Sequence, residues 1–158
     1  MRFPILIVAT ALAGTNGLAC ADANGAAGQE SARTTSSQQV GTMKIRIDVE
    51  GSRVTATLDD NETSRDFVSL LPLTLTLEDY SATEKISDLP KRLSTKGTPP
   101  GVDPSIGDIA YYAPWGNLAL FYKDAGYARG LVKIGTLDSG VEAFRVPGSP
   151  KVTIDRVD

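Results

Sequence analysis

The sequence predicts a mainly β fold, a closed antiparallel barrel of about eight strands with one or two short helices. Apolar and polar residues alternate in several short segments, which is the pattern of strands with one buried face. Turn-forming residues separate these segments at regular, short intervals. Only one segment has a clear helical pattern, which argues against a parallel sheet covered by helices.

The first strands are expected as a hairpin. Apolar and charged side chains alternate over residues 43–49, and the alternation resumes at 54–58 after the dipeptide Gly51-Ser52. A tight turn between two alternating runs is typical of a β-hairpin. Leucines alternate with polar residues again over 73–77, which predicts a third strand.

A short helix is expected between the hairpin and the third strand. Thr63 is followed three residues later by Asp66, which is similar to a capping box with Asp in place of Glu. Phe67 and the Leu70-Leu71 pair share one helical face, and Pro72 ends the helix.

The second half of the chain begins with an irregular segment from Tyr80 to Gly107, where prolines and glycines predict loops with one or two brief strands. Further strands are expected at 108–113, 117–123, 131–135 and 151–157, with a short turn or helix at 139–144. The interior of such a small barrel is filled by its own side chains. A binding site is therefore expected on the outer wall or in the loops.

Residues 1–20 have the pattern of an export signal: Arg2, then an apolar stretch too short to span a bilayer, then small residues. Two interpretations of its end remain open. Cys20 is either an ordinary residue near the cleavage site or the lipid-modified first residue of a lipoprotein. Residues 21–41 are rich in small and polar residues and are expected to be a flexible tether. The barrel domain is expected at 42–158, exported to the periplasm, the cell envelope or the medium.

The amino-acid composition argues against several kinds of catalytic, metal and nucleic-acid-binding site. The chain has no histidine, one cysteine and a net charge of −3, which argues against a Ser-His-Asp triad, common zinc sites and nucleic-acid binding. We expect no metal, no cofactor, and membrane attachment only through a lipid on Cys20. The neighbouring carboxylates Glu78, Asp79 and Glu84 lack calcium-loop spacing, so we expect them at a solvated strand end.

The run GDIAYYAPWGNLALFY, residues 107–122, concentrates aromatic residues around one turn. Alternation points Ile109, Leu118 and Leu120 into the barrel and places Tyr112 and Phe121 outside. Two interpretations remain open: these rings cover the wall where a helix docks, or they line a cleft for a peptide or small ligand. The candidate binding residues are Tyr112, Trp115, Asn117 and Phe121. Exposed aromatics also allow a weak dimer in place of a monomer.

The order of these segments resembles that of cyclophilins. The resemblance rests on the run from Gly130 to Gly135, the run from Asp138 to Phe144, and the last strand from Val152 to Asp155. Residues 107–114, followed by Gly116-Asn117, are similar to a compact bacterial group of cyclophilin-like fold proteins. The resemblance covers residues 43–157 and implies a closed barrel.

Cyclophilins are peptidyl-prolyl isomerases, and the family carries an arginine in a Phe-x-Arg-like strand, a glutamine further on and a pocket histidine. The corresponding region, residues 80–94, has neither Phe-x-Arg nor glutamine. The leading hypothesis is therefore a non-catalytic binding domain. The alternative is a prolyl isomerase acting on exported proteins, with Arg92 as its candidate catalytic residue, and a third hypothesis is a structural or accessory protein of the envelope.

Overall fold

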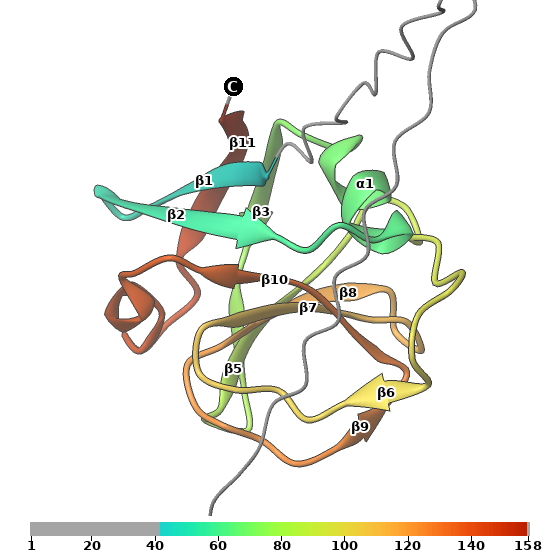
Figure 1. Ribbon diagram of the computed structural model, residues 1–158. Helices are drawn as coiled ribbons and strands as arrows, with labels where there is room; N and C mark the ends of the chain where they lie inside the picture. The colour runs from blue at the N-terminus through green and yellow to red at the C-terminus, as the bar shows by residue number, and fades with distance from the viewer. Residues whose placement is uncertain (1–41, 158) are drawn as a thin grey trace, which may run out of the picture. The chain divides into compact units, whose positions relative to one another are not determined.

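One antiparallel sheet of nine strands provides the frame of the computed structural model, which describes residues 42–157. The predicted export signal, Cys20 and the tether lie outside the described residues. The strands follow the order β3-β11-β1-β2-β10-β7-β8-β5-β4, and β6 and β9 form a separate small sheet (Figure 1). The element bounds are β1 Met43–Val49, β2 Ser52–Leu58, α1 Glu62–Val68, β3 Leu73–Thr76, β4 Glu78–Tyr80, β5 Glu84–Asp88, β6 Gly101–Val102, β7 Asp108–Tyr112, β8 Asn117–Phe121, β9 Ala128–Arg129, β10 Leu131–Leu137, the 3₁₀-helix η1 Val141–Phe144, and β11 Lys151–Val157.

The sheet curls into a nearly closed barrel because its two edge strands are consecutive in the chain. Leu77 alone separates β3 from β4, so one extended segment pairs with β11 at its first half and with β5 at its second. Leu77 is fully buried, and its N–H donates to the Pro150 carbonyl at 2.9 Å. The predicted antiparallel barrel is confirmed, with additional short strands from the segment between Tyr80 and Gly107.

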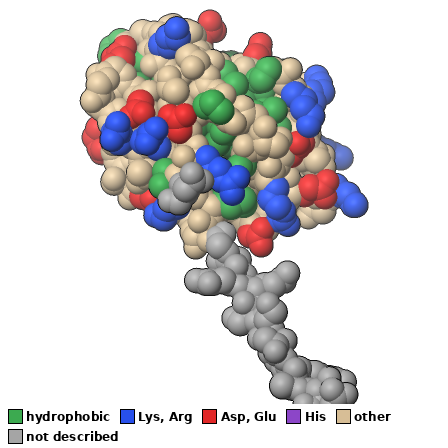
Figure 2. Space-filling model, turned by 90° about the horizontal axis from the view of Figure 1, so that it is seen from above, with side chains coloured by type: hydrophobic (Ala, Val, Ile, Leu, Met, Phe, Trp, Pro, Cys, Tyr) green, Lys and Arg blue, Asp and Glu red, His purple; other side chains and the backbone are tan. Residues whose placement is uncertain are grey.

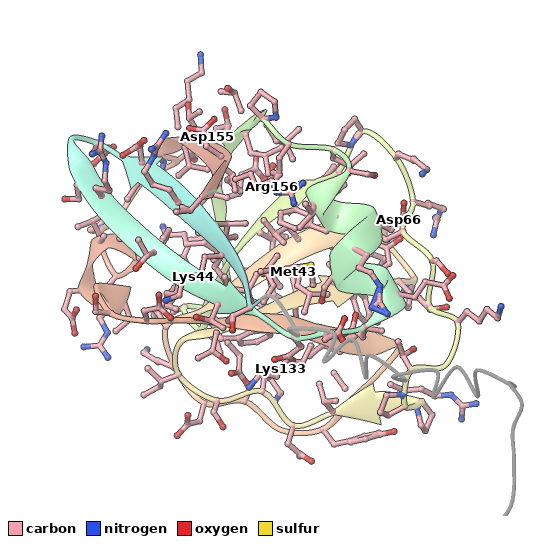
Figure 3. The ribbon with its side chains drawn as sticks, turned by 45° about the horizontal axis from the view of Figure 1, so that its top comes forward. Met43, Lys44, Asp66, Lys133, Asp155 and Arg156 are labelled. Carbon is pink, nitrogen blue, oxygen red and sulfur yellow. The ribbon has the colours of Figure 1, made fainter. Side chains whose placement is uncertain are left out.

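The predicted hairpin is present as β1 and β2, in register from Met43 opposite Leu58 to Val49 opposite Ser52. Its apolar side chains face the barrel core and are almost fully buried. The alternate polar side chains lie outside, where Arg46 contacts Asp155 at 2.9 Å and Lys44 contacts Asp138 at 3.0 Å. Figure 3 shows Lys44 on β1 and Asp155 on the neighbouring strand β11. The strand pattern is thus explained by burial on one face and exposed ion pairs on the other.

Side chains of both charges are interspersed on the face shown in Figure 2. No helix among residues 42–157 is both long and apolar enough to cross a membrane.

The helix α1 begins two residues earlier than predicted. Its N-cap is Asn61, whose side-chain oxygen accepts from the Ser64 N–H at 2.8 Å. The predicted capping box at Thr63 and Asp66 is wrong, because both side chains are used in contacts with Ser94. The Thr63 hydroxyl donates to the Ser94 carbonyl at 2.6 Å, and Asp66 accepts from the Ser94 N–H at 2.9 Å.

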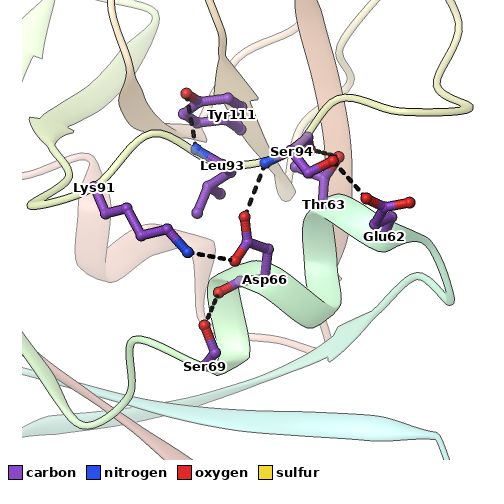
Figure 4. A network of polar contacts seen from close by, with 8 residues as sticks. All are labelled: Glu62, Thr63, Asp66, Ser69, Lys91, Leu93, Ser94 and Tyr111. Atoms are coloured by element: carbon purple, nitrogen blue, oxygen red, sulfur yellow. Dashed lines mark hydrogen bonds and ion pairs between the residues drawn. The ribbon is translucent and has the colours of Figure 1, made fainter.

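These contacts fasten the loop that follows β5 to the barrel (Figure 4). Besides Ser94, the Asp66 carboxylate contacts the Lys91 ammonium at 3.0 Å. On the other side of the loop, the Leu93 N–H donates to the Tyr111 hydroxyl at 3.1 Å. The loop carrying Arg92 is therefore held by α1 and by β7.

The Asp66 contacts are expected to contribute to acid sensitivity. The Ser94 N–H and then Lys91 hold the pKa of Asp66 below its ordinary value. A carboxylate with a lowered folded pKa stabilises the fold above its unfolded pKa, and this contribution is lost as the pH falls through the folded value. Asp66→Asn should lower the free energy of unfolding by about 1 kcal/mol at neutral pH, and less in acid. Urea denaturation at neutral and acidic pH measures this effect.

The control is Asp60→Asn, which removes an exposed carboxylate from the contact with Arg65 at 2.6 Å. We expect little change, because exposed ion pairs contribute at most about 1 kcal/mol. A loss for Asp66→Asn that is no larger than the loss for Asp60→Asn at neutral pH would contradict the prediction.

A lysine ammonium lies inside the barrel. Lys85 is fully buried on β5, and its Nζ donates to the Gly148 carbonyl at 3.0 Å and lies 3.2 Å from an Asp79 carboxylate oxygen. The same Asp79 oxygen accepts from the Tyr122 hydroxyl at 2.8 Å. Burial, and then the hydrogen bond to Asp79, raise the pKa of Tyr122 to about 12. The barrel interior thus contains a charged side chain beside its apolar ones.

Candidate ligand-binding pocket on the outer wall

The hairpin of β7 and β8 separates two apolar clusters. Ile109, Leu118 and Leu120 belong to the main core inside the barrel, as the alternation predicts. Phe121 belongs to a second, smaller cluster with Ala119 and other residues, and Tyr112 packs against it. Both faces of β7 and β8 are buried, one in the barrel core and the other in the outer cluster. Nearly every residue of these strands is therefore apolar.

A cavity of about 220 Å³ lies on the outer wall. All four residues predicted as a binding site line it, brought together by the turn and register of β7 and β8. The lining residues are Tyr80, Glu84, Ile86, Pro104, Tyr112, Trp115, Asn117, Ala119, Phe121, Ala125, Ala128 and Leu131. The alternative prediction, a docked helix, is wrong for the described chain: Val102, Ala125 and Ala128 from the β6 and β9 region pack against this wall.

Three aromatic rings form one side of the cavity. Trp115 makes edge-to-face contacts with Tyr80 at a centroid distance of 5.5 Å and with Tyr112 at 5.3 Å. Trp115 is 54% exposed and Tyr80 is 41% exposed. Sequence reasoning missed Tyr80, because only the pairing of β4 with β5 and of β5 with β8 brings it near the hairpin.

The turn that carries Trp115 is fixed from two directions. Gly116 has a φ of 81° and its N–H donates to the Tyr112 carbonyl at 2.8 Å. Glycine adopts this left-handed conformation without a steric penalty. The Arg92 guanidinium donates to the Ala113 carbonyl at 2.7 Å and to the Pro114 carbonyl at 3.5 Å. Arg92, the residue predicted for the isomerase alternative, therefore supports the turn and is not among the lining residues.

Glu84 is the charged residue of the cavity lining. It lies on β5 opposite Tyr80 on one side and Phe121 on the other. Burial raises the pKa of its carboxyl to about 7. The expectation of a solvated strand end is therefore wrong for Glu84, because β5 lies between two other strands. The spacing of Glu84 and Ile86, two residues apart and thus on one face of a strand, is the sequence signal that could have found it.

Asn117 lines the buried part of the cavity and is 2% exposed. Its side-chain N–H₂ group donates to the Leu118 carbonyl at 3.2 Å. Its Oδ1 atom is buried and has no hydrogen-bond partner in the described chain. Unpaired buried acceptors are uncommon and are often found where a ligand or water binds.

Fold and site together define a small antiparallel barrel with an aromatic pocket on its outer wall. A sequence model described as the cyclophilin-like family matches residues 47–155, and the chain belongs to this family. A similar solved structure is the solution structure of the hypothetical protein AF2241 from Archaeoglobus fulgidus. It is 20% identical, with a TM-score of 0.57, and the match covers 73% of this chain and 95% of that chain.

The likeness to AF2241 supports the fold, and the family match confirms the predicted resemblance. The bacterial origin suggested by the resemblance stays a prediction. No curated protein matches the chain.

Proposed function

We propose that this protein is a binding domain whose outer-wall pocket holds a small ligand or a single side chain of a peptide. The observation that carries the proposal is the cavity lined by Tyr112, Trp115 and Phe121, at which the Trp115 ring stays 54% exposed, whereas a purely structural role would bury it. Pockets that bind drug-sized ligands have volumes of about 300–1,000 Å³. The smaller cavity of this protein, about 220 Å³, favours a ligand the size of one side chain.

Binding is favoured over prolyl isomerisation by the position of Arg92. An isomerase of the cyclophilin type needs a guanidinium facing the bound proline, as the family resemblance implies. Arg92 instead donates to two carbonyls of the β7–β8 turn. We also propose that the domain acts after export, on the basis of the signal pattern in residues 1–20.

Fluorescence of Trp115, the one tryptophan in the chain, provides a direct test. The protein is titrated with small aromatic alcohols, small amines and N-acetylated amides of single amino acids, including proline. We expect at least one of these probes to shift the emission in a saturable manner. An emission spectrum that no probe changes would overturn the proposal.

Trp115→Ala is expected to weaken binding of a responsive probe by about tenfold, because buried aromatic contacts commonly contribute 1 kcal/mol or more. Calorimetry measures the affinity, since the variant has no tryptophan. Tyr127→Ala is the matched control: Tyr127 is an exposed aromatic residue, 57% accessible, outside the cavity lining. Equal losses in the two variants would contradict a specific role for Trp115.

A further inference from the structure

Two oxygen acceptors of the pocket have no donor within the described chain. The Glu84 side-chain carboxylate makes no hydrogen bond or ion pair with the described residues, and Asn117 Oδ1 is buried without a partner. The orientation of Asn117 follows from its N–H₂ group, which donates to the Leu118 carbonyl; the reversed amide would place two acceptors together. A buried acceptor without a donor raises the free energy of the folded protein. A ligand that supplies N–H groups would recover this free energy.

The aromatic side chains that line the pocket can also bind a cation. Tyr80, Tyr112 and Trp115 present aromatic rings at the mouth, and aromatic faces attract cations that lie within about 6 Å of the ring centroid. Glu84 is the one charged side chain among the described lining residues. The pocket therefore offers negative charge and aromatic rings to a ligand.

We propose that the pocket selects an organic ammonium ion with an apolar substituent, and that Glu84 provides its counter-charge. This inference rests on the proposed binding function and specifies its ligand class. The ammonium N–H groups would donate to Glu84, and the apolar part would contact Phe121, which lies opposite Glu84 on β8, and the neighbouring aliphatic side chains. The ammonium belongs either to a free small amine or to a lysine side chain of a peptide.

Because Glu84 would provide the counter-charge of the bound cation, the affinity for the ligand should depend on pH. Burial raises the pKa of Glu84 to about 7 in the free protein, and a bound ammonium favours the ionised carboxylate. Binding below pH 7 should therefore release a proton, and affinity should rise with pH and level off above about pH 7.5. The titratable groups around Glu84 are Tyr80 on β4, Tyr112 on β7 and Tyr122 next to β8. The Lys85 ammonium lies inside the barrel.

The test compares 2-phenylethylamine with its neutral counterpart 2-phenylethanol, by Trp115 fluorescence of the full chain. At about pH 8 we expect the amine to bind at least about tenfold more tightly, a difference of roughly 1.4 kcal/mol. The preference should decline towards pH 5.5. N-acetyl-lysine methylamide is the third probe: tighter binding than 2-phenylethylamine would identify a peptide lysine as the source of the ammonium, and weaker binding would identify a small amine.

Glu84→Gln should abolish both the preference for the amine and its pH dependence, while 2-phenylethanol still binds. Asp88→Asn is the matched control, since Asp88 is an exposed carboxylate on the same strand outside this cavity. Far-ultraviolet circular dichroism verifies that both variants fold. Equal affinities for amine and alcohol in the parent protein would overturn this inference but leave the pocket a binding site. Failure of every probe to bind would overturn both proposals.

Discussion

Replacing Phe67 with alanine is expected to lower the free energy of unfolding by about 3–5 kcal/mol. Phe67 is fully buried and joins α1 to the main core of the barrel. The helix has seven residues, too few to be stable without tertiary packing. Loss of the ring would leave a cavity and remove the main apolar contact of the helix. Urea denaturation followed by circular dichroism measures the effect.

Arg65→Ala is the control for Phe67→Ala. Arg65 lies on the same helix, is exposed, and contacts Asp60 on the surface. We expect a change of at most about 1 kcal/mol, as for other exposed ion pairs. A similar small loss for Phe67→Ala would show that the helix does not depend on its contact with the core.

Asp79→Ala is expected to lower the free energy of unfolding by about 3 kcal/mol, because the fully buried ammonium of Lys85 would lose its counter-charge. Lys85→Met should cost much less, since it replaces the ammonium with an apolar group of similar length. In the Lys85→Met background, Asp79→Ala should have a smaller effect, which is the loss of the hydrogen bond from the Tyr122 hydroxyl. Denaturation of the two single variants and the double variant measures this coupling.

The coupling between Asp79 and Lys85 should weaken in acid. The Tyr122 hydroxyl and then Lys85 hold the pKa of Asp79 below its ordinary value. The stabilisation is therefore present above the unfolded pKa of about 3.9 and is lost as the pH falls through the lower folded value. Additive effects of the two substitutions at neutral pH would contradict the proposed dependence of Lys85 on Asp79.

Much of the barrel could be predicted from alternation. Segments such as 43–49 and 151–157 have one apolar face, and burial of that face against the core determines both strand type and orientation. The two faces of 108–112 were also assigned correctly, because Ile109 packs inside while Tyr112 packs outside. A shift of the strand register by one residue would turn the apolar side chains away from the core. The alternation therefore determines which face of each strand is buried.

Alternation does not predict the orientation of strand β5. Its inward side chain Lys85 is charged and its outward side chains include the apolar Ile86, so the polar pattern is the reverse of an ordinary half-buried strand. Only distant partners make this arrangement stable: Asp79 and the Gly148 carbonyl for the lysine. The spacing of Glu84 and Ile86 indicates that they share one face of a strand, but the distant contacts that turn this face towards the pocket are not visible in the local pattern.

Long-range contacts also explain the two remaining differences. Thr63 resembles an N-cap locally, but its hydroxyl bonds to Ser94, and Asn61 caps the helix instead. Arg92 resembles a free cation in a loop, but its guanidinium binds the carbonyls of the β7–β8 turn. Both contacts join residues about twenty to thirty positions apart, which local pattern rules do not describe.

The single-residue junction at Leu77 has a consequence for self-association. Free strand edges are templates on which other polypeptides add and aggregate. In this barrel the two edges are β3 and β4, which have four and three residues, and the chain passes directly from one to the other. Each offers only a short row of amides to an incoming strand, so the described sheet presents little template for fibril-like polymerisation.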